Sequence, residues 1–332
     1  VRLIFDMYTQ MLNPFFRSTL KRRYRRYSIL FAHFPWSATA AYKVIKHKIP
    51  LVYVAHDFEY GAIRQATQNP LIRRFAYNVE KYACRRAIKI LCVSQRDMRD
   101  LEMAYGISAA KLALLPNTVD IDFLSQTSTL YDKATERQKL GFDPSSLLLL
   151  FHGRMDYSAN LDALRFILNE LMPALREQGD DNINLLVVGA RIPKWCFDIK
   201  DKTVSFYSDV PDMRRFLSIA DVIIVPLSIG GGTRLKILES FAARVPVIST
   251  AKGAEGIDCQ DGWHVLIAQR NANDFINKVK MLSESESLRR KLTSNAYELV
   301  MQKYSIPVAS KYLQEVIMEA ESQAKRVKVV QD

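Results

Sequence analysis

The arrangement of apolar runs is the feature that most constrains how this chain can fold. Short runs rich in β-branched and large apolar residues alternate with longer amphipathic segments, and the runs lack a clear period of two. This pattern is typical of strands buried on both faces, as in parallel sheets covered by helices. In chain order the runs are SILFAHF, PLVYVAH, IKILCVS, LALLPN, LLLLFHG, INLLVVGA, VSFYSDV, DVIIVPL and PVIST.

The segments between these runs have helical spacing, most clearly at 71–88, 160–177, 211–219, 233–243 and 271–284. Alternation of strands and helices on this scale predicts an α/β architecture. A polar stretch without a strand of its own, residues 121–146, separates two such series. We therefore expect two Rossmann-like, doubly wound parallel-sheet domains that face a cleft, at residues 1–140 and 145–305. Residues 306–332 are expected to form a helix that packs back toward the first domain, and a polar tail.

The composition bears on the cellular compartment of the protein and on whether it binds zinc or spans a membrane. The chain has 332 residues and four cysteines, none of them in CxxC or CxxH spacing, which predicts reduced thiols of a cytoplasmic protein without a zinc site. No apolar run approaches the ~18 residues that a membrane span needs. The chain begins with Val1, and we expect no signal peptide.

The net charge of +12 is concentrated near the start of the chain. Residues 1–27 hold seven basic side chains and one acid, Asp6. Aromatic and basic residues interleave over 15–27, FFRSTLKRRYRRY, which suits a surface that faces anionic lipid. A solvated helix face is the alternative interpretation.

The chain has only 12 glycines, and three of them stand together in PLSIGGGTRLKILESFAA. The apolar run DVIIVPL before them predicts a strand, and the segment after them predicts a helix. Glycines at such a turn let a ligand approach the backbone, and the free N–H groups of the following helix bind anions. Arg234 and Lys236 are expected in the first turn of that helix, where cations oppose its dipole. A bound diphosphate would resolve this mismatch.

Glu239 lies one turn further along and flanks the expected apolar face of Leu235, Leu238 and Ala242. A carboxylate at the edge of a buried face needs hydrogen-bond donors, and ribose hydroxyl groups beside a diphosphate would supply them. A solubilising Glu behind a flexible turn is the alternative.

This stretch resembles the donor-site segment of the family-4 retaining glycosyltransferases, which have the GT-B fold. In that family a Glu-x7-Glu motif opens the helix, and its second Glu, matched by Glu239, binds the donor ribose. Gly231 stands at the first Glu position, so the resemblance implies that the backbone of the turn Gly231, Gly232 and Thr233 contacts the donor.

Further segments carry the same resemblance. LLLLFHGRMDYSANLDAL is similar to the family's Gly-Arg strand and turn, which implies that Gly153 and Arg154 lie at the diphosphate. Asn160 stands where the family has a lysine, and Arg234 and Lys236 are expected to replace its charge.

The stretch VSFYSDVPDMRRFLSIADVIIVPL implies that Val210 lies near the base. LVYVAHDFEYGA resembles the strand end whose His, here His56, lies beside the donor sugar.

The resemblance implies a retaining hexosyltransferase that moves a sugar from a nucleotide diphosphate sugar to an acceptor. The resemblance further implies an acceptor that is a cell-envelope or exopolysaccharide glycan or a glycolipid, and we expect the enzyme to meet it at the inner face of the membrane. His56 and Arg234 are the expected catalytic residues. No cofactor, no obligate metal ion and no nucleic acid partner are expected.

Two alternatives remain open on the sequence. A nucleotide-sugar epimerase of the same fold would hold the same nucleotide and need no acceptor, and a non-catalytic basic module would bind nucleic acid or lipid. Residues 1–27 contain no glycine, so the glycine-rich first loop of the resembled family has no counterpart there. We expect the first strand of the N-terminal domain to lie upstream of Val1.

Overall fold

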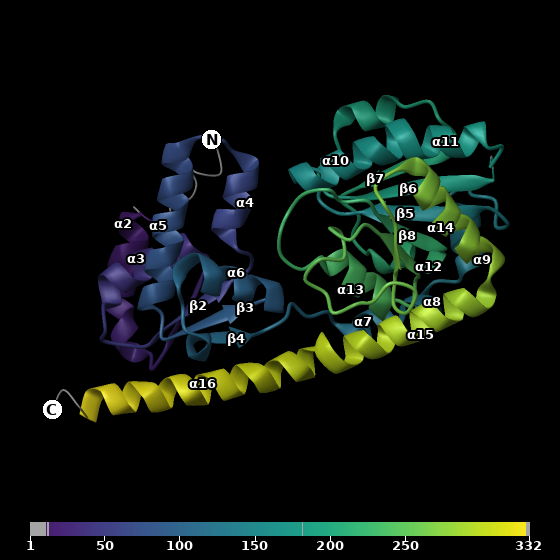
Figure 1. Cartoon of the computed structure of the whole chain (residues 1–332). Coiled ribbons are helices and arrows are strands. Elements are labelled where there is room, and N and C mark those ends of the chain that lie inside the picture. Colours follow the sequence, from purple (N-terminus) through teal and green to yellow (C-terminus); the bar gives the residue numbers. More distant parts are fainter. Residues whose placement is uncertain (1–10, 12, 181, 330–332) are drawn as a thin grey trace. The chain divides into compact units, whose positions relative to one another are not determined.

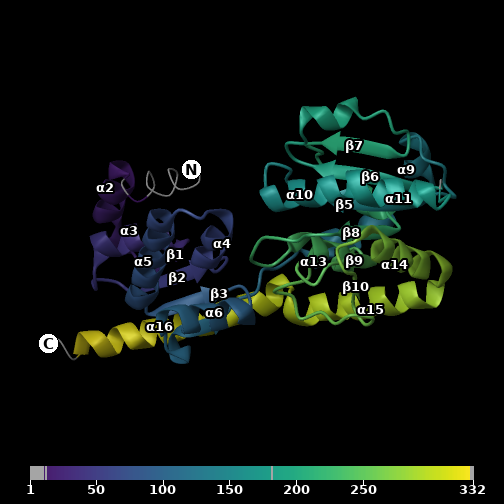
Figure 2. The same ribbon diagram turned by 45° about the horizontal axis from the view of Figure 1, so that its top comes forward.

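The computed structural model describes residue 11 and residues 13–180 and 182–329, and they form two compact units. The first unit comprises the chain up to Asn117, the turn Gly231–Thr233 and the segment from Pro307 onward. The second comprises Thr118–Gly230 and Arg234–Ile306. Figure 1 labels their helices and strands, and Figure 2 shows the same ribbon from a second direction.

The first unit is built on a four-stranded parallel sheet whose strands follow one another in chain order, β1-β2-β3-β4. The strands are β1 (Leu30–His33), β2 (Leu51–Ala55), β3 (Lys89–Cys92) and β4 (Leu112–Leu114). The described residues ahead of β1 form α2 (Pro14–Arg23) and the short helix η1 (Tyr24–Arg26), and contain no strand. Residues 1–10 and 12 lie outside the described residues, and the expectation of a strand upstream of Val1 stays a prediction.

Helices cover both faces of this sheet. In β2 the side chains of Leu51, Tyr53 and Ala55 pack with helices 35–45, 70–86 and 95–105, whereas Val52 and Val54 pack with the C-terminal helix 306–329. Because successive side chains of a strand point to opposite faces, a strand buried on both faces reads as one apolar run. Besides α2 and η1, the described helices of this unit are α3 (Pro35–Ile45), α4 (Glu59–Ala66), α5 (Pro70–Arg86), α6 (Gln95–Tyr105), η2 (Ala109–Lys111) and α16 (Ile306–Val329).

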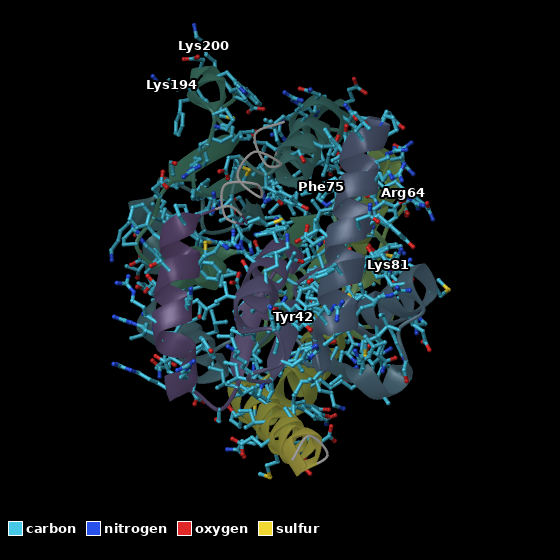
Figure 3. The ribbon with its side chains drawn as sticks, turned by 90° about the vertical axis from the view of Figure 1, so that its left-hand side faces the viewer. Tyr42, Arg64, Phe75, Lys81, Lys194 and Lys200 are labelled. Atoms are coloured by element: carbon cyan, nitrogen blue, oxygen red, sulfur yellow. The ribbon has the colours of Figure 1, made fainter. Side chains whose placement is uncertain are left out.

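Helices α3 and α5 pack side by side through aromatic and polar contacts. Thr39 donates a hydrogen bond to the carbonyl of Val79 at 3.2 Å, and the guanidinium of Arg86 lies 5.2 Å from the ring centre of Tyr42. Figure 3 labels Tyr42 between these helices and Lys81 on α5. These contacts fix the layer that lies against one face of the sheet.

The second unit contains a six-stranded parallel sheet in the order β10-β9-β8-β5-β6-β7. The chain runs outward from β5 in one direction and from β8 in the other, so the switch point of this doubly wound sheet lies between β5 and β8. The strands are β5 (Leu147–His152), β6 (Ile183–Gly189), β7 (Val204–Ser208), β8 (Val222–Val225), β9 (Val247–Ser249) and β10 (Leu266–Ile267).

One large apolar core joins this sheet to its helices. Leu148, Leu149, Leu150 and Phe151 of β5 are all fully buried in it. The helices are α7 (Ile121–Ser125), α8 (Thr127–Leu130), α9 (Lys133–Lys139), α10 (Ser158–Phe166), η3 (Ile167–Leu171), α11 (Met172–Glu177), η4 (Lys194–Asp198), α12 (Arg214–Ile219), α13 (Leu235–Ala242), α14 (Ala272–Glu284) and α15 (Glu286–Lys303).

The structure confirms the predicted fold class of two parallel α/β units, and each of the predicted strands is present. It adds the two-residue edge strand β10, which is too short to leave a sequence signal. The predicted helix 160–177 is present as α10 and α11, with the π-turn η3 between them. Pro173 in the first turn of α11 lacks the N–H that an uninterrupted α-helix would use, which accounts for the change of register.

The boundary between the units differs from the expected position near residue 140. The structure places residues 118–140 in the second unit. Val119 forms an isolated bridge with Ser305, and Ile121 and Leu124 lie in the core of the second unit. The sequence analysis missed these contacts, because most residues of this stretch are polar and only a few apolar ones attach it to the second unit.

Candidate functional site

The carboxyl ends of the parallel strands in the second unit gather the predicted site residues. His152 ends β5 and is followed by Gly153 and Arg154. Pro226–Gly230 follow β8, and α13 then begins at Leu235. Because this edge includes the switch point between β5 and β8, it is where an open α/β sheet binds its ligand.

Two strand ends approach each other at glycines. A Cβ atom on Gly189 would lie 1.8 Å from the carbonyl oxygen of Gly153, so only glycine fits at the end of β6. A Cβ on Gly153 would lie 2.9 Å from Nδ2 of Asn160 and 3.0 Å from Nζ of Lys236. The backbone of Gly153 is therefore in immediate reach of an amide and an ammonium group.

Asn160 and Lys236 meet although they are far apart in the sequence. Nζ of Lys236 donates a hydrogen bond to Oδ1 of Asn160 at 2.8 Å, and Nδ2 of Asn160 donates to the carbonyl of Arg154 at 2.8 Å. The same ammonium group lies 4.6 Å from the ring centre of Phe151. Lys236 thus places a cation at Asn160, the position at which the resembled family carries its lysine.

The pKa of Lys236 lies close to neutral pH. Burial and the nearby charge of Arg234 lower the pKa of Lys236 to about 7, while Glu239 opposes the shift. An anion bound here would favour the protonated form and raise this pKa. The site can therefore gain positive charge as it binds an anion.

The sequence predicted Arg234 in the first turn of α13, but the structure places Arg234 directly before the helix. Its backbone is extended (φ −85°, ψ 93°) in the N-cap position, and the residue is 7% exposed. The expected apolar face also differs, because Leu235 is 44% exposed while Ile237, Leu238, Phe241 and Ala242 are buried. Lys236 alone of the two cations lies in the first turn.

Glu239 lies on α13 at the edge of the site, with 35% of its side chain exposed. Burial raises its pKa, and the charge of Lys236 acts in the opposite direction. Oε2 of Glu239 lies 3.9 Å from Nδ1 of His152. His152 is a residue that the sequence analysis did not assign to the site, because a histidine within an apolar strand gives no signal of its own.

Arg154 is the most exposed member of the site, with 63% of its side chain accessible. Its guanidinium group is paired with Asp156 at 2.7 Å, and Arg191 also contacts Asp156 at 2.8 Å. The hydrogen bond from Arg154 and the two positive charges hold the pKa of Asp156 below its usual value. Two guanidinium groups therefore converge on one carboxylate beside Gly153.

Val210, a predicted site residue, and Gly230, the first glycine of the turn, also lie in the second unit. Val210 follows β7 and packs, partly buried, against the core. Gly230 has a φ of +108°, and a Cβ there would lie 2.7 Å from the hydroxyl of Tyr157 and 3.1 Å from Nη2 of Arg234. The glycine at this turn leaves room for both side chains.

The remaining predicted residues belong to the first unit. Gly231, Gly232 and Thr233 are grouped there. His56 directly follows β2, and its Nε2 lies 2.7 Å from Nδ1 of His33 at the end of β1. Burial and the neighbouring His33 lower the pKa of His56. Parallel pairing of β1 with β2 brings these two imidazoles together.

A buried carboxylate holds the segment that follows His56. Glu80 of α5 is fully buried and accepts hydrogen bonds from the backbone N–H groups of Glu59 and Tyr60, at 3.1 and 2.8 Å. The hydroxyls of Tyr53 and Tyr105 also donate to it, at 3.3 and 2.8 Å. Glu80 thus caps the first turn of α4.

Burial raises the pKa of both carboxyl groups in this cluster. The pKa of Glu80 rises to about 7, against the effect of its hydrogen bonds. The pKa of Glu59 rises to about 8, with the charges of Glu80 and Asp57 as further causes. The sequence analysis gave no indication of Glu80, because an isolated Glu in a helix reads as a solvated residue.

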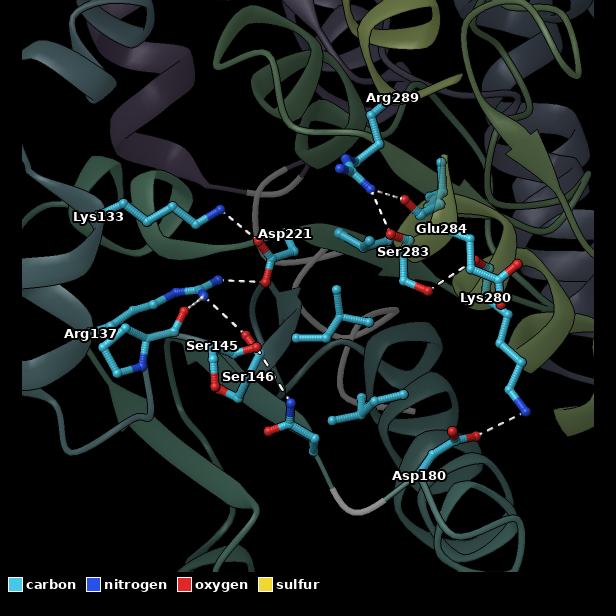
Figure 4. A pocket seen from close by; sticks show the side chains of 16 residues that line it. Lys133, Arg137, Ser145, Ser146, Asp180, Asp221, Lys280, Ser283, Glu284 and Arg289 are labelled. Atoms are coloured by element: carbon cyan, nitrogen blue, oxygen red, sulfur yellow. Dashed lines mark hydrogen bonds and ion pairs between the residues drawn. The ribbon is translucent and has the colours of Figure 1, made fainter. Parts of the chain in front are cut away.

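A charged cavity lies at the opposite, amino-terminal edge of the second sheet, beside Leu147, Ile183 and Val222, and measures about 840 Å³. Figure 4 shows ion pairs among several of its charged groups. Lys133 and Arg137 both contact Asp221, and Lys280 lies 3.1 Å from Asp180. Arg137 also donates to the carbonyls of Ile219, Pro144 and Ser146. These ion pairs tie α9 to the residue that precedes β8, and α14 to the loop between α11 and β6.

Two features are absent from the described residues. Across 13–180 and 182–329, no group of three or more His, Cys, Asp or Glu side chains is placed to hold a metal ion. Within the same ranges, no helix has the length and apolar character needed to cross a membrane.

Sequence comparison identifies related proteins in both units. The family "Glycosyl transferases group 1" matches residues 146–285, and "Glycosyltransferase Family 4" matches residues 2–123. The chain is 22% identical to TuaC of Bacillus subtilis (strain 168), named as a glycosyltransferase of teichuronic acid biosynthesis, over 86% of this chain and 69% of that protein. It is 27% identical to the lipopolysaccharide 1,2-N-acetylglucosaminetransferase of Salmonella typhimurium (strain LT2), over 60% of this chain and 54% of that protein.

Solved structures share the fold. HepE of Anabaena in complex with UDP superimposes with a TM-score of 0.73 at 16% identity, over 91% of this chain and 82% of that one. WaaG, a glycosyltransferase involved in lipopolysaccharide biosynthesis, gives a TM-score of 0.62 at 18% identity, over 83% and 82%. The two family matches together span both units, and each unit has the parallel α/β architecture of the solved structures. The chain belongs to the family-4-like glycosyltransferases of the GT-B fold.

Proposed function

We propose that the protein transfers a hexosyl group from a nucleoside diphosphate sugar to a glycan or glycolipid acceptor of the cell envelope, with retention of the anomeric configuration. The observation that carries the proposal is the cation of Lys236, held by Asn160 beside the backbone of Gly153 at the switch point of the second sheet. The names of the relatives, which include teichuronic acid and lipopolysaccharide enzymes, support the acceptor class.

The proposed chemistry is electrostatic. Departure of a nucleoside diphosphate develops negative charge on the leaving group, and preorganised cations stabilise it. Lys236, Arg234 and Arg154 supply positive charge at this edge of the sheet, and Glu239 binds the ribose. Since these side chains supply the positive charge, the proposal needs no obligate metal ion, and transfer is expected to survive chelation by EDTA.

The first test is a thermal-shift panel of nucleoside diphosphates and their sugars, because a ligand of the native state raises the melting temperature by mass action. HepE, which shares this fold, was crystallised with UDP and with UDP-glucose, so uridine nucleotides are the first members of the panel. Lys236→Gln should abolish the shift. Lys280→Gln, which removes a lysine from the opposite edge of the same sheet, should leave it unchanged.

The second test supplies the bound sugar nucleotide with and without an envelope glycan acceptor. Transfer of the sugar only when the acceptor is present supports the proposal. A new sugar nucleotide formed without any acceptor would identify an epimerase instead. Absence of a saturable nucleotide site in the panel would refute the proposal and favour a binding module.

A further inference from the structure

Phe34 has a backbone conformation that its residue type does not explain. It directly follows β1 and occupies the N-cap position of α3, with φ 68° and ψ 149°. A side chain clashes with the backbone in this region, which is essentially restricted to glycine. Five of the described residues other than glycine have a positive φ, and Phe34 is the one with an apolar side chain. Phenylalanine therefore carries a conformational cost here that glycine would avoid.

The N-cap position adds a second cost. Ser, Thr, Asp and Asn are preferred there because their side chains accept a hydrogen bond from the first turn of the helix, and phenylalanine cannot do so. The backbone of Phe34 is nevertheless held on both sides. Its N–H donates to the carbonyl of Val54 in β2 at 3.2 Å, and its carbonyl accepts from the N–H of Ala38 at 3.1 Å. Strained residues that their surroundings hold in this way cluster at functional sites.

The side chain of Phe34 belongs to a series of four aromatic rings, each in contact with the next. Trp36 anchors the series, because it is 7% exposed and packs in a small apolar cluster with α4 and α5. The ring of Phe34 stacks on Trp36, with centres 4.9 Å apart and planes at 5°, and its centre lies 4.9 Å from that of His56. His56 in turn stacks on His33 at 5.0 Å. These separations are those of favourable aromatic contacts.

The imidazole of His56 is thereby held from two directions. Its Nε2 atom lies 2.7 Å from Nδ1 of His33, and the ring of Phe34 packs against it. A single hydrogen bond leaves a ring free to turn about the bond, and a packed neighbour removes this freedom. Phe34 does not simply fill the core, since 36% of it remains exposed. Because the contact with His33 uses Nε2, a hydrogen bond from the imidazole to a substrate has to come from Nδ1.

We propose that Phe34 is a positioning residue for sugar transfer: its strained backbone aims the ring at His56, and the ring holds the imidazole in one orientation at the carboxyl edge of the first sheet. This inference rests on the proposed function and on the assignment of His56 to the transferred sugar. Loss of the orientation should lower the rate of transfer. Nucleotide binding should not depend on Phe34, because the cations assigned to the diphosphate belong to the second unit.

The first test measures the contact itself, by proton NMR of the histidine rings in the full chain. The chain has five histidines, and the signals of His56 are assigned by their absence from His56→Ala. An aromatic ring shifts the resonances of the ring packed against it, so Phe34→Gly should move the His56 signals and Phe34→Tyr should move them little. The pKa of His56, which burial and His33 hold low, should rise in Phe34→Gly because water reaches the imidazole.

The second test separates rate from binding, with the donor and acceptor of the proposed function. Phe34→Gly and Phe34→Ala should lower kcat by about tenfold or more, since small misplacements of a reacting group are costly, while affinity for the nucleoside diphosphate changes by less than about twofold. Phe34→Tyr keeps the ring and should retain most of the turnover. Phe197→Ala is the matched control, because Phe197 is a 54% exposed phenylalanine of η4 in the second unit. Its removal should leave kcat unchanged.

Thermal unfolding tests the backbone strain. Glycine is free of the clash at this φ and alanine is not, so Phe34→Gly should melt at a higher temperature than Phe34→Ala, although both variants have lost the ring. A higher melting temperature for the alanine variant would show that the backbone is not strained, and would overturn the inference.

The other outcomes distinguish the inference from the proposed function. Unchanged His56 signals in Phe34→Gly would overturn the inference, because the ring would then not hold the imidazole. Shifted signals with unchanged kcat would overturn it as well, because the contact would then serve packing alone. If the unmodified protein binds neither UDP, GDP nor ADP, the proposed function itself falls, whatever the NMR comparison shows.

Discussion

The ammonium group of Lys236 on α13 lies 2.8 Å from Oδ1 of Asn160 on α10. The resembled family carries a lysine at the position of Asn160, and here the cation reaches that position from a different helix. The exchange keeps a positive charge beside the backbone of Gly153 while α10 supplies a neutral amide that orients it. The following predictions start from this pair.

Nucleotide affinity should fall as the pH rises above about 7. The free site holds Lys236 with a pKa of about 7, and a bound diphosphate favours its charged form. Binding at higher pH must therefore take up a proton, so affinity is greatest below about pH 7 and decreases toward pH 9. Calorimetry in two buffers of different ionisation enthalpy should show the uptake directly.

Lys236→Arg provides the control for this pH dependence, because a guanidinium group stays charged throughout the range. Titration of the nucleotide's own phosphate affects both proteins equally, so it cancels in the comparison. A pH profile for Lys236→Arg that is identical to that of the unmodified protein would show that Lys236 is not the titrating group.

Glu239→Gln should weaken binding of a nucleoside diphosphate by about 1–3 kcal/mol, the range for a hydrogen bond to a charged group. The fold should be unaffected, because 35% of this side chain is exposed and α13 is held by its buried apolar face. Affinity can be measured by calorimetry and stability by thermal unfolding. Unchanged affinity for the free nucleotide would rule out a ribose contact.

Arg234→Ala should lower turnover more than donor binding, since the charge on the leaving group is greatest in the transition state. Steady-state kinetics with the identified donor would separate kcat from KM. Arg290→Ala is the matched control, because Arg290 is an exposed arginine of α15 paired with Glu286. A loss of donor affinity with unchanged kcat would limit Arg234 to ground-state binding.

His56→Ala should lower sugar transfer while nucleotide binding is retained. His56 belongs to the first unit and pairs with His33, whereas the cations assigned to the diphosphate belong to the second. His47→Ala is a suitable control, since His47 interacts with Tyr42 on the adjacent helix α3. A drop in nucleotide affinity in the His56 variant would contradict its assignment to the sugar.

The basic segment at α2 should bind vesicles that contain anionic lipid. Exposed cations crowd this helix and η1 without an acid among them, and Phe15 is 82% exposed. The exposed cations are Arg17, Lys21, Arg22, Arg23, Arg25 and Arg26, while Arg2 lies outside the described residues. Each cation near an anionic membrane contributes about 1 kcal/mol, and salt screens this attraction.

Flotation with phosphatidylglycerol vesicles should therefore carry the protein upward, and phosphatidylcholine vesicles or high salt should not. Substitution of Arg22 and Arg26 by Glu should abolish flotation, and substitution of Lys133 and Lys139 by Glu on α9 gives a control of equal charge change. Binding that is independent of lipid charge would eliminate the electrostatic interpretation.

Much of the fold could be predicted from the sequence because the signal is local. The run LLLLFHG becomes β5, whose Leu148–Phe151 are buried, and strands buried on both faces must be apolar at every position. The glycines after β8 likewise predicted a turn, and Gly230 does take a positive φ there. The ends of the helices were predicted less accurately from the sequence. Arg234 occupies the N-cap position of α13 instead of lying within the helix, because the position of an N-cap depends on one backbone dihedral angle.

The amino-acid sequence by itself determined the strands, the glycine turn at the switch point and the cations that stand beside it. Only the tertiary structure decided which side chains meet. Asn160 meets Lys236, His152 faces Glu239, and Glu80 caps α4, and none of these partners is within one helical turn of the other in the chain. Periodicity reports which face of an element is buried, whereas these contacts depend on how neighbouring strands and helices align at a common sheet edge.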